Sequence, residues 1–321
     1  MANEKRRLVV KIGTSSLILP NGRVNLRTVD RLAYTLASLN NQGFQVALVS
    51  SGAIGAGLAS LQLTQRPQEI AKQQALAAIG QMELMRIYSQ RFLDYQTQVA
   101  QILLTRDVLA FPVSRQHVLN TFEVLFEEGV IPIVNENDTV AVDELDHHTT
   151  FSDNDELSAM VAVRLQADQL IVLSDIDGFY DQNPRENPAA KKLARVTELT
   201  PAMQKAAGGS GSNFGTGGMV TKLRAAQAMM AVGKQMVLCN GANPTVIFDV
   251  VAGKPVGTVF GQNFWMKGRE NDGNLSENGT SRQTSSAAAG LIVNGNQKSG
   301  LNSDGPSVRS SNYGYFSSES S

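Results

Sequence analysis

The chain has 321 residues, one cysteine, and a formal net charge of −1 from 28 lysines and arginines against 29 aspartates and glutamates. This near-neutral charge provides no basic field for nucleic acid or an anionic membrane, so we expect neither as a partner. A single cysteine excludes an intramolecular disulfide and a multi-cysteine metal site, and no apolar run has the length of a membrane helix; together these features indicate a reduced, cytoplasmic protein.

Apolar runs typical of strands alternate with stretches of helical periodicity from residue 1 to residue 261. The predicted elements in chain order are strand 8–12, helix 26–39, strand 44–49, helix 70–92, strand 99–104, helix 115–128, strand 130–134, a helix from about 154 to 166, strand 169–173, helix 219–232 and strand 235–238. Strands that alternate with long helices predict βαβ units with right-handed crossovers. The expected fold is therefore α/β, a three-layer αβα sandwich with a mainly parallel open sheet.

Residues 262–321 differ from the rest of the chain in composition. They contain 13 serines, 8 asparagines and 8 glycines, with 5 basic and 5 acidic side chains. Such a segment buries too little apolar area to offset the entropy lost when it becomes ordered. We therefore predict one domain over residues 1–261 and a low-complexity, mostly disordered tail over 262–321.

Small, hydroxyl and acidic residues, together with one lysine, lie at or just after the ends of four of the predicted strands. They are Lys11 with 13–15, then 50–52, then Asn135 to Asp138, and finally Ser174-Asp175. Each of these segments taken alone also fits a turn or a helix cap. Because ligands of parallel sheets lie beyond the carboxyl ends of the strands, four such segments at one edge favour a binding site there.

Two glycine-rich segments precede predicted helices. Backbone amides of Ser50 to Gly57 are suited to an anion, but their glycine spacing does not match a dinucleotide fingerprint. In Gly208 to Lys222 the glycines allow backbone amides to approach a polyphosphate, and Lys222 lies in the first turn of the helix that starts near Met219. The spacing is not that of a P-loop, and a flexible surface loop with a solvated lysine is the alternative.

The segment Asp153-Asn154-Asp155 fits the start of a helix, with Asp153 as the cap. Asp155 lies within the first turn, where it is placed to orient a lysine or hold a magnesium ion. The neighbouring pair His147-His148 has no third ligand at a metal-binding spacing, so no protein-bound metal site is predicted.

Six segments together resemble the amino acid kinase family, and in particular its members that phosphorylate L-glutamate. They are VVKIGTS at 9–15, VSSGAIGAG at 49–57, PIVNEND at 132–138, SDNDELSA at 152–159, LSDIDGFY at 173–180, and GTGGMVTK at 215–222. The segments cover the predicted domain from end to end, in the order found in the family. The combination of 49–57 with 132–138 distinguishes the glutamate-specific members from the others.

The resemblance implies ATP-dependent phosphorylation of the side-chain carboxylate of L-glutamate, which gives L-glutamyl 5-phosphate in the first step of proline biosynthesis. The N-terminal part of the domain would bind glutamate and the C-terminal part ATP, with Mg²⁺ accompanying the nucleotide. By position, the implied catalytic residues are Lys11, Asp155 and Lys222; the implied glutamate-binding residues are Ser51, Asn135, Asp138 and Asn154; and the implied ATP-binding residues are Lys11, Ser174, Asp175, Thr216, Gly217, Gly218, Met219, Val220, Thr221 and Lys222.

The resemblance also implies a homo-oligomer, feedback inhibition by proline, and coupling to glutamyl phosphate reductase. Many of these family members carry a C-terminal PUA domain, and no strand pattern of that kind is recognisable in 262–321. Two alternatives remain open at the level of sequence. One is another kinase of the same family, acting on acetylglutamate or aspartate, and the other is a non-catalytic amino-acid sensor.

Overall fold

The computed structural model describes residues 6–140, 154–184, 186–207 and 218–262. The chain divides into two units, Met1–Gly273 and Asn274–Ser321, and all the described residues lie in the first. Except for Gln262, the segment 262–321 lies outside the described residues, so its disorder and the domain boundary near Gly261 stay predictions.

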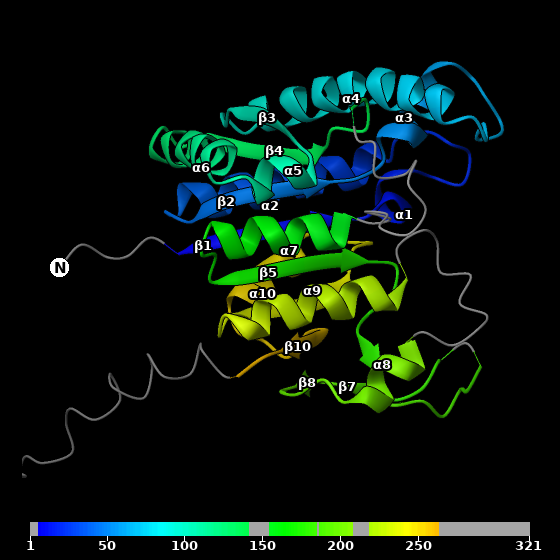
Figure 1. The fold of residues 1–321 in the computed structure, drawn as a ribbon, viewed down its shortest axis with the longest axis vertical. Helices are drawn as coiled ribbons and strands as arrows, with labels where there is room; N and C mark the ends of the chain where they lie inside the picture. Colours follow the sequence, from blue (N-terminus) through cyan, green and yellow to red (C-terminus); the bar gives the residue numbers. More distant parts are fainter. Residues whose placement is uncertain (1–5, 141–153, 185, 208–217, 263–321) are drawn as a thin grey trace, which may run out of the picture. The chain divides into compact units, whose positions relative to one another are not determined.

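A central sheet of eight strands has the order β3-β4-β2-β1-β5-β9-β10-β8 (Figure 1). Its strands are β1 Arg7–Ile12, β2 Gln45–Ser50, β3 Val99–Leu104, β4 Ile131–Glu136, β5 Gln169–Ser174, β8 Arg195–Val196, β9 Gln235–Asn240 and β10 Thr258–Phe260. The strands from β3 to β9 in this order are parallel, and β10 pairs antiparallel with β9. A separate small sheet joins β6 (Phe179–Tyr180) to β7 (Lys192–Leu193). The predicted mainly parallel sheet is confirmed.

Helices cover both faces of the sheet, as predicted (Figure 1). They are α1 Thr14–Leu17, α2 Leu26–Asn41, α3 Ala53–Ser60, α4 Ile70–Leu93, α5 Arg106–Ala110, α6 Pro112–Glu127, α7 Asn154–Arg164, α8 Pro201–Ala207, α9 Met219–Ala231 and α10 Val246–Val251. One core contains residues of α2, α3, α4 and α10, and the other contains residues of α6, α7 and α9. Among the described residues, none of these helices combines the length and hydropathy that a membrane span requires.

The alternation of side chains along β1 decides which way its polar residue points. Leu8, Val10 and Ile12 lie in the core beneath α2 and α4, whereas Val9 lies in the core beneath α7 and α9. Because successive strand side chains point to opposite faces, Lys11 shares the face of Val9. The strand therefore delivers a lysine, only 3% exposed, to the layer that contains α7 and α9.

The glycines after β2 pack helices together. The helix α3 begins at Ala53, so Gly55 and Gly57 lie inside it and not in a loop before it, contrary to the simplest interpretation of that segment. A Cβ on Gly57 would lie 2.1 Å from the carbonyl oxygen of Leu76, and one on Gly80 would lie 1.8 Å from that of Ala53. Only glycine permits backbones to approach this closely, so these two residues hold α3 against α4.

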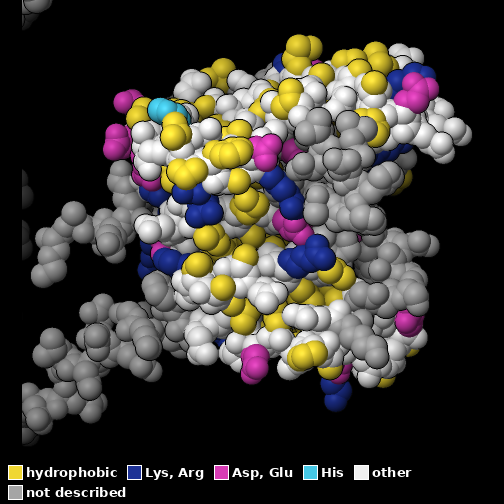
Figure 2. Space-filling view, in the orientation of Figure 1, with side chains coloured by type: hydrophobic (Ala, Val, Ile, Leu, Met, Phe, Trp, Pro, Cys, Tyr) yellow, Lys and Arg dark blue, Asp and Glu magenta, His cyan; other side chains and the backbone are white. Residues whose placement is uncertain are grey.

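Charged side chains of both signs are interspersed over the described part of the face in Figure 2, in keeping with the net charge of −1. The buried charged side chains among the described residues are Lys11, Asp155 and Lys222.

Candidate active site

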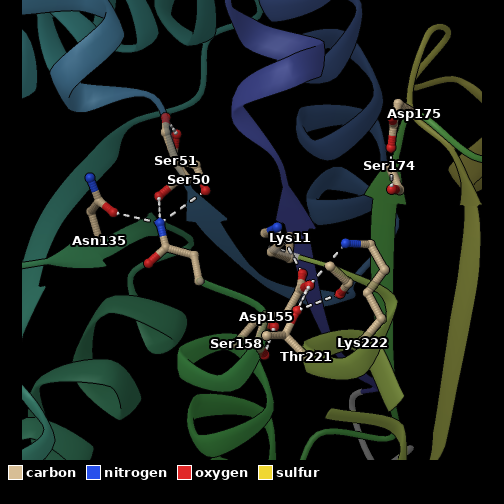
Figure 3. Close-up of polar contacts among 12 residues, drawn as sticks. Lys11, Ser50, Ser51, Asn135, Asp155, Ser158, Ser174, Asp175, Thr221 and Lys222 are labelled. Carbon is tan, nitrogen blue, oxygen red and sulfur yellow. Dashed lines mark hydrogen bonds and ion pairs between the residues drawn. The ribbon is translucent and has the colours of Figure 1, made fainter. Parts of the chain in front are cut away.

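The carboxyl ends of β1, β2, β4 and β5 meet at one edge of the sheet, where α7 and α9 also begin (Figure 3). The strand ends carry Lys11, Ser50-Ser51, Asn135 and Ser174. The first turns of the two helices carry Asp155 and Lys222. The sequence prediction that the polar strand ends share one edge is confirmed by this topology.

Two lysines converge on one buried carboxylate, and the three residues Lys11, Asp155 and Lys222 form the ionic cluster. Lys11 Nζ lies 2.7 Å from Asp155 Oδ1, and Lys222 Nζ lies 3.1 Å from Asp155 Oδ2. Thr221 Oγ1 donates a further hydrogen bond of 3.0 Å to Oδ2. Asp155 is fully buried, and the two lysines are 3% and 7% exposed. The three formal charges sum to +1, which makes this cluster attractive to an anionic group brought to the edge of the sheet.

Local helix geometry places the members of this cluster. Asp155 occupies the first turn of α7, where a carboxylate is favoured by the helix dipole, and Ser158 Oγ donates to its backbone carbonyl at 2.6 Å. Lys222 occupies the first turn of α9, where the dipole disfavours a cation. Its ion pair with Asp155 therefore compensates for an unfavourable position, and a bound anion would compensate further.

A second cluster, the amide cluster, consists of Ser50, Ser51, Asn135 and Asn154. Asn154 Nδ2 lies 2.9 Å from each of three acceptors, the carbonyl oxygen of Ser50, Ser51 Oγ and Asn135 Oδ1. Asn154 thus contacts two of the other three residues predicted to bind the substrate, Ser51 and Asn135. The fourth, Asp138, lies in the turn after β4 and is partly buried. An amide nitrogen has only two hydrogens for these three acceptors, so the rotatable Ser51 hydroxyl is the one that can turn to a ligand.

The two clusters adjoin because Asn154 and Asp155 are consecutive residues. Asn154 belongs to the amide cluster, and Asp155 holds the two lysines. A group bound at the amide cluster therefore lies beside a group held by the lysines.

The residues predicted to bind the nucleotide lie on the other side of Lys222. Ser174 is buried at the end of β5 and donates a 3.1 Å hydrogen bond to the exposed Asp175. Gly218, Met219 and Val220 are partly buried at the start of α9. Several predicted residues lie outside the described part of the chain: Asp153, Thr216, Gly217 and the pair His147-His148.

Sequence reasoning missed two residues of α4 that reach this edge. Gln81 Oε1 accepts a 2.8 Å hydrogen bond from Asn135 Nδ2, and the hydroxyl of Tyr88 lies 2.9 Å from Ser50 Oγ. Burial raises the pKa of Tyr88 well above its ordinary value, although the Ser50 hydrogen bond acts in the opposite direction. Tyr88 therefore stays neutral. The seven-residue spacing places both side chains on one helical face, which is the only sequence signal available for them.

The described residues include no group of three or more histidine, cysteine, aspartate or glutamate side chains placed to hold a metal ion. Both oxygens of Asp155 already contact lysines or Thr221. The carboxylate of Asp155 therefore holds the two lysine ammonium groups, and neither of its oxygens is left over for a metal ion.

The fold and site define an α/β protein that presents paired, buried cations at the carboxyl edge of a parallel sheet. The family model described as the amino acid kinase family matches residues 6–240. The chain belongs to the amino acid kinase family.

Curated relatives agree with this membership. The chain is 56% identical over 256 residues to a glutamate 5-kinase of Lactiplantibacillus plantarum, in a match that covers 80% of this chain and 97% of the relative. It is 54% identical over 257 residues to a glutamate 5-kinase of Enterococcus faecalis, with coverage of 80% and 95%. These relatives thus consist almost entirely of the part that matches this chain.

Solved structures with the same fold include a carbamate kinase from Giardia lamblia bound to AMP-PNP. Its TM-score is 0.58 at 16% identity, and the match covers 81% of this chain and 99% of that one. A UMP kinase from Ureaplasma parvum has a TM-score of 0.54 at 16% identity, with coverage of 80% and 99%. At such low identity these matches support the fold alone, and they confirm the predicted sandwich.

Proposed function

We propose that this protein transfers a phosphoryl group from ATP to the side-chain carboxylate of L-glutamate, which forms L-glutamyl 5-phosphate in the first step of proline biosynthesis. The observation that carries the proposal is the adjacency of the two clusters at the start of α7, in a chain 56% identical to a glutamate 5-kinase. One cluster suits a polar amino acid, and the other suits a phosphate group.

The reaction needs no general base from the protein. A glutamate side chain has a pKa of about 4.3, so its carboxylate is ionised and nucleophilic at neutral pH. Phosphoryl transfer depends on in-line positioning and on cations around the equatorial oxygens of the transferring group. Lys11 and Lys222 supply these cations, and Asp155 holds both ammonium groups in place. The task of the protein is therefore electrostatic preorganisation.

The two substrates occupy opposite sides of this ionic cluster. Ser51, Asn135 and Asn154 hold the amino acid, and the carboxylate of Asp138 pairs with its ammonium group. ATP lies along Ser174-Asp175 and the segment from Thr216 to Lys222, where the amide groups at the start of α9 face the phosphates. An acceptor without a free ammonium group, such as acetylglutamate, would lose the pairing with Asp138.

Magnesium fits this site as an ion carried by the nucleotide. Because both oxygens of Asp155 are engaged, the donor set suits an ion that is held mainly by phosphate oxygens and water. Bound Mg²⁺ would neutralise charge on the phosphates. The lysines remain the protein's own contribution to the transferring group.

A hydroxamate assay tests the proposed reaction, because hydroxylamine traps the acyl phosphate that a carboxylate kinase forms. We expect hydroxamate formation to require ATP, Mg²⁺ and L-glutamate, and to be much slower with acetylglutamate or aspartate. Equal turnover with acetylglutamate would contradict the assignment of the acceptor. Ligand binding without any turnover would favour an amino-acid sensor.

A truncated chain tests the proposed domain boundary. We expect residues 1–261 to remain folded and active, because no proposed site residue lies beyond Lys222 and the Lactiplantibacillus plantarum relative consists almost entirely of the matching part. The measurements are the thermal unfolding midpoint and the hydroxamate rate of the truncated and full-length chains. Loss of solubility or activity on truncation would place part of the functional body after residue 261.

We further expect a cytoplasmic location, a homo-oligomeric assembly, inhibition by proline, and coupling to glutamyl phosphate reductase.

A further inference from the structure

Two backbone groups determine how the amide side chains of Asn135 and Asn154 are oriented, that is, where each oxygen and each nitrogen points. The carbonyl oxygen of Ser50 can only accept, so Asn154 must turn its Nδ2 toward β2. The backbone N–H of Glu136 can only donate, and at 2.9 Å it turns Asn135 Oδ1 toward itself. The same Oδ1 accepts from Asn154 Nδ2, so both constraints agree.

This direction leaves the amide nitrogen of Asn135 facing α4. Asn135 is only 3% exposed, so an unpaired N–H there would carry a desolvation penalty. Gln81 Oε1 accepts from Asn135 Nδ2 at 2.8 Å. The amide of Gln81 is thereby the acceptor that completes a chain of hydrogen bonds from α4 through Asn135 to Asn154.

The helix that carries Gln81 is itself firmly placed. Gly80 approaches the backbone of Ala53, where a Cβ would lie 1.8 Å from the carbonyl oxygen. One face of α4 also presents the hydroxyl of Tyr88 to Ser50 Oγ at 2.9 Å. Two side chains of this helix thus hold the end of β2, which Ser51 follows, and the end of β4, which carries Asn135.

We propose that Gln81 is a positioning residue for the amino acid substrate. Its Oε1 pairs with the buried Nδ2 of Asn135 and so holds that amide in the orientation set by the backbone of Glu136, in which Oδ1 accepts from Asn154 at the junction with the ionic cluster. The inference rests on the proposed function, because it assigns the amide cluster to the amino acid. We expect Gln81 to affect the binding of the amino acid and not of ATP, because it is connected by hydrogen bonds to Asn135 and Asn154 and not to the lysines.

The variant Gln81→Met keeps the length of the side chain and removes the acceptor. We expect the KM for glutamate to rise by about 2- to 12-fold, the range that corresponds to the net contribution of one hydrogen bond that orders the binding residues, with the KM for ATP close to wild type. Gln90→Met is the matched control, because Gln90 is an exposed glutamine of the same helix. An unchanged KM for glutamate in Gln81→Met, or an equal rise in both KM values, would overturn the proposal.

A double-mutant cycle tests whether Gln81 acts through Asn135. In an Asn135→Ala background, Gln81→Met should add little to the glutamate KM, because the donor it serves is already absent. A full additional effect in that background would show that Gln81 acts by another route and would overturn the proposal.

A crystal structure of Gln81→Met provides a readout that does not depend on turnover. We expect the Asn135 side chain to rotate and its contact with Asn154 Nδ2 to be lost. An unchanged arrangement would overturn the positioning role, whatever the substrate. A wild-type protein that fails to phosphorylate glutamate would instead overturn the proposed function, so the two failures are distinguishable.

Discussion

Replacing Lys11 by methionine is expected to lower kcat by about two to three orders of magnitude, the usual effect of removing one preorganised donor from a transition state. Methionine retains an unbranched side chain of similar length, so the change removes the charge and leaves the packing at the end of β1 largely intact. The loss should appear in kcat more than in the KM for glutamate, because the contacts of Lys11 lead to Asp155 and not to the amide cluster.

The matched control for this variant is Lys234→Met. Lys234 Nζ pairs with Asp168 Oδ1 at 2.9 Å, at the start of β9 and far along the sheet from the carboxyl edge. It is a lysine–aspartate pair of similar geometry with no proposed part in the reaction. Steady-state rates should separate the two variants clearly. A kcat for Lys11→Met close to that of the wild type would remove Lys11 from the catalytic group.

Asp155→Asn is expected to damage both stability and activity. Asparagine preserves the shape of the side chain and can still accept from Thr221, but it leaves two buried ammonium groups without their carboxylate. Removing one partner from a buried ion pair typically costs about 3–5 kcal/mol, which corresponds to a fall of roughly 6–20 °C in the thermal unfolding midpoint. Activity should fall as well, because the lysines lose the group that holds them.

ATP provides a diagnostic for the Asp155→Asn variant. The phosphates supply negative charge to the same two lysines, so adding ATP without glutamate should recover part of the lost stability. Asp168→Asn is the control, because Asp168 is only partly buried and lies outside the proposed site. If thermal scans show equal losses for the two variants, the cluster around Asp155 has no special electrostatic role.

The parallel core of the sheet was predictable because β1, β2, β4, β5 and β9 are largely apolar runs that are almost entirely buried. All six parallel strands from β3 to β9 correspond to predicted runs, and the 99–104 prediction coincides with β3. The short strands β6, β7, β8 and β10 were not predicted, since two or three residues cannot display a period. The short helices α1, α3, α5, α8 and α10 were also not predicted, because four to eight residues span too few turns to display a helical period.

The ionic cluster was predictable in part, because Lys11, Asp155 and Lys222 each follow a recognisable strand end or helix start. Their convergence within about one hydrogen-bond length depends on how α7 and α9 pack, which no local pattern encodes. Gln81 lies in the middle of a long predicted helix, where a glutamine carries no functional signature. Its contact with Asn135 arises only when α4 packs against the ends of β2 and β4.

The consecutive placement of Asn154 and Asp155 has a mechanical consequence. One planar peptide unit separates their Cα atoms by about 3.8 Å, and this spacing cannot stretch when helices shift. If α7 moves, Asn154 and Asp155 therefore move together, so the amide cluster and the ionic cluster shift in the same direction. The spacing between the backbone positions of Asn154 and Asp155 is thus set by covalent geometry at one end of α7, which makes it insensitive to motions that reshape the rest of the sheet edge.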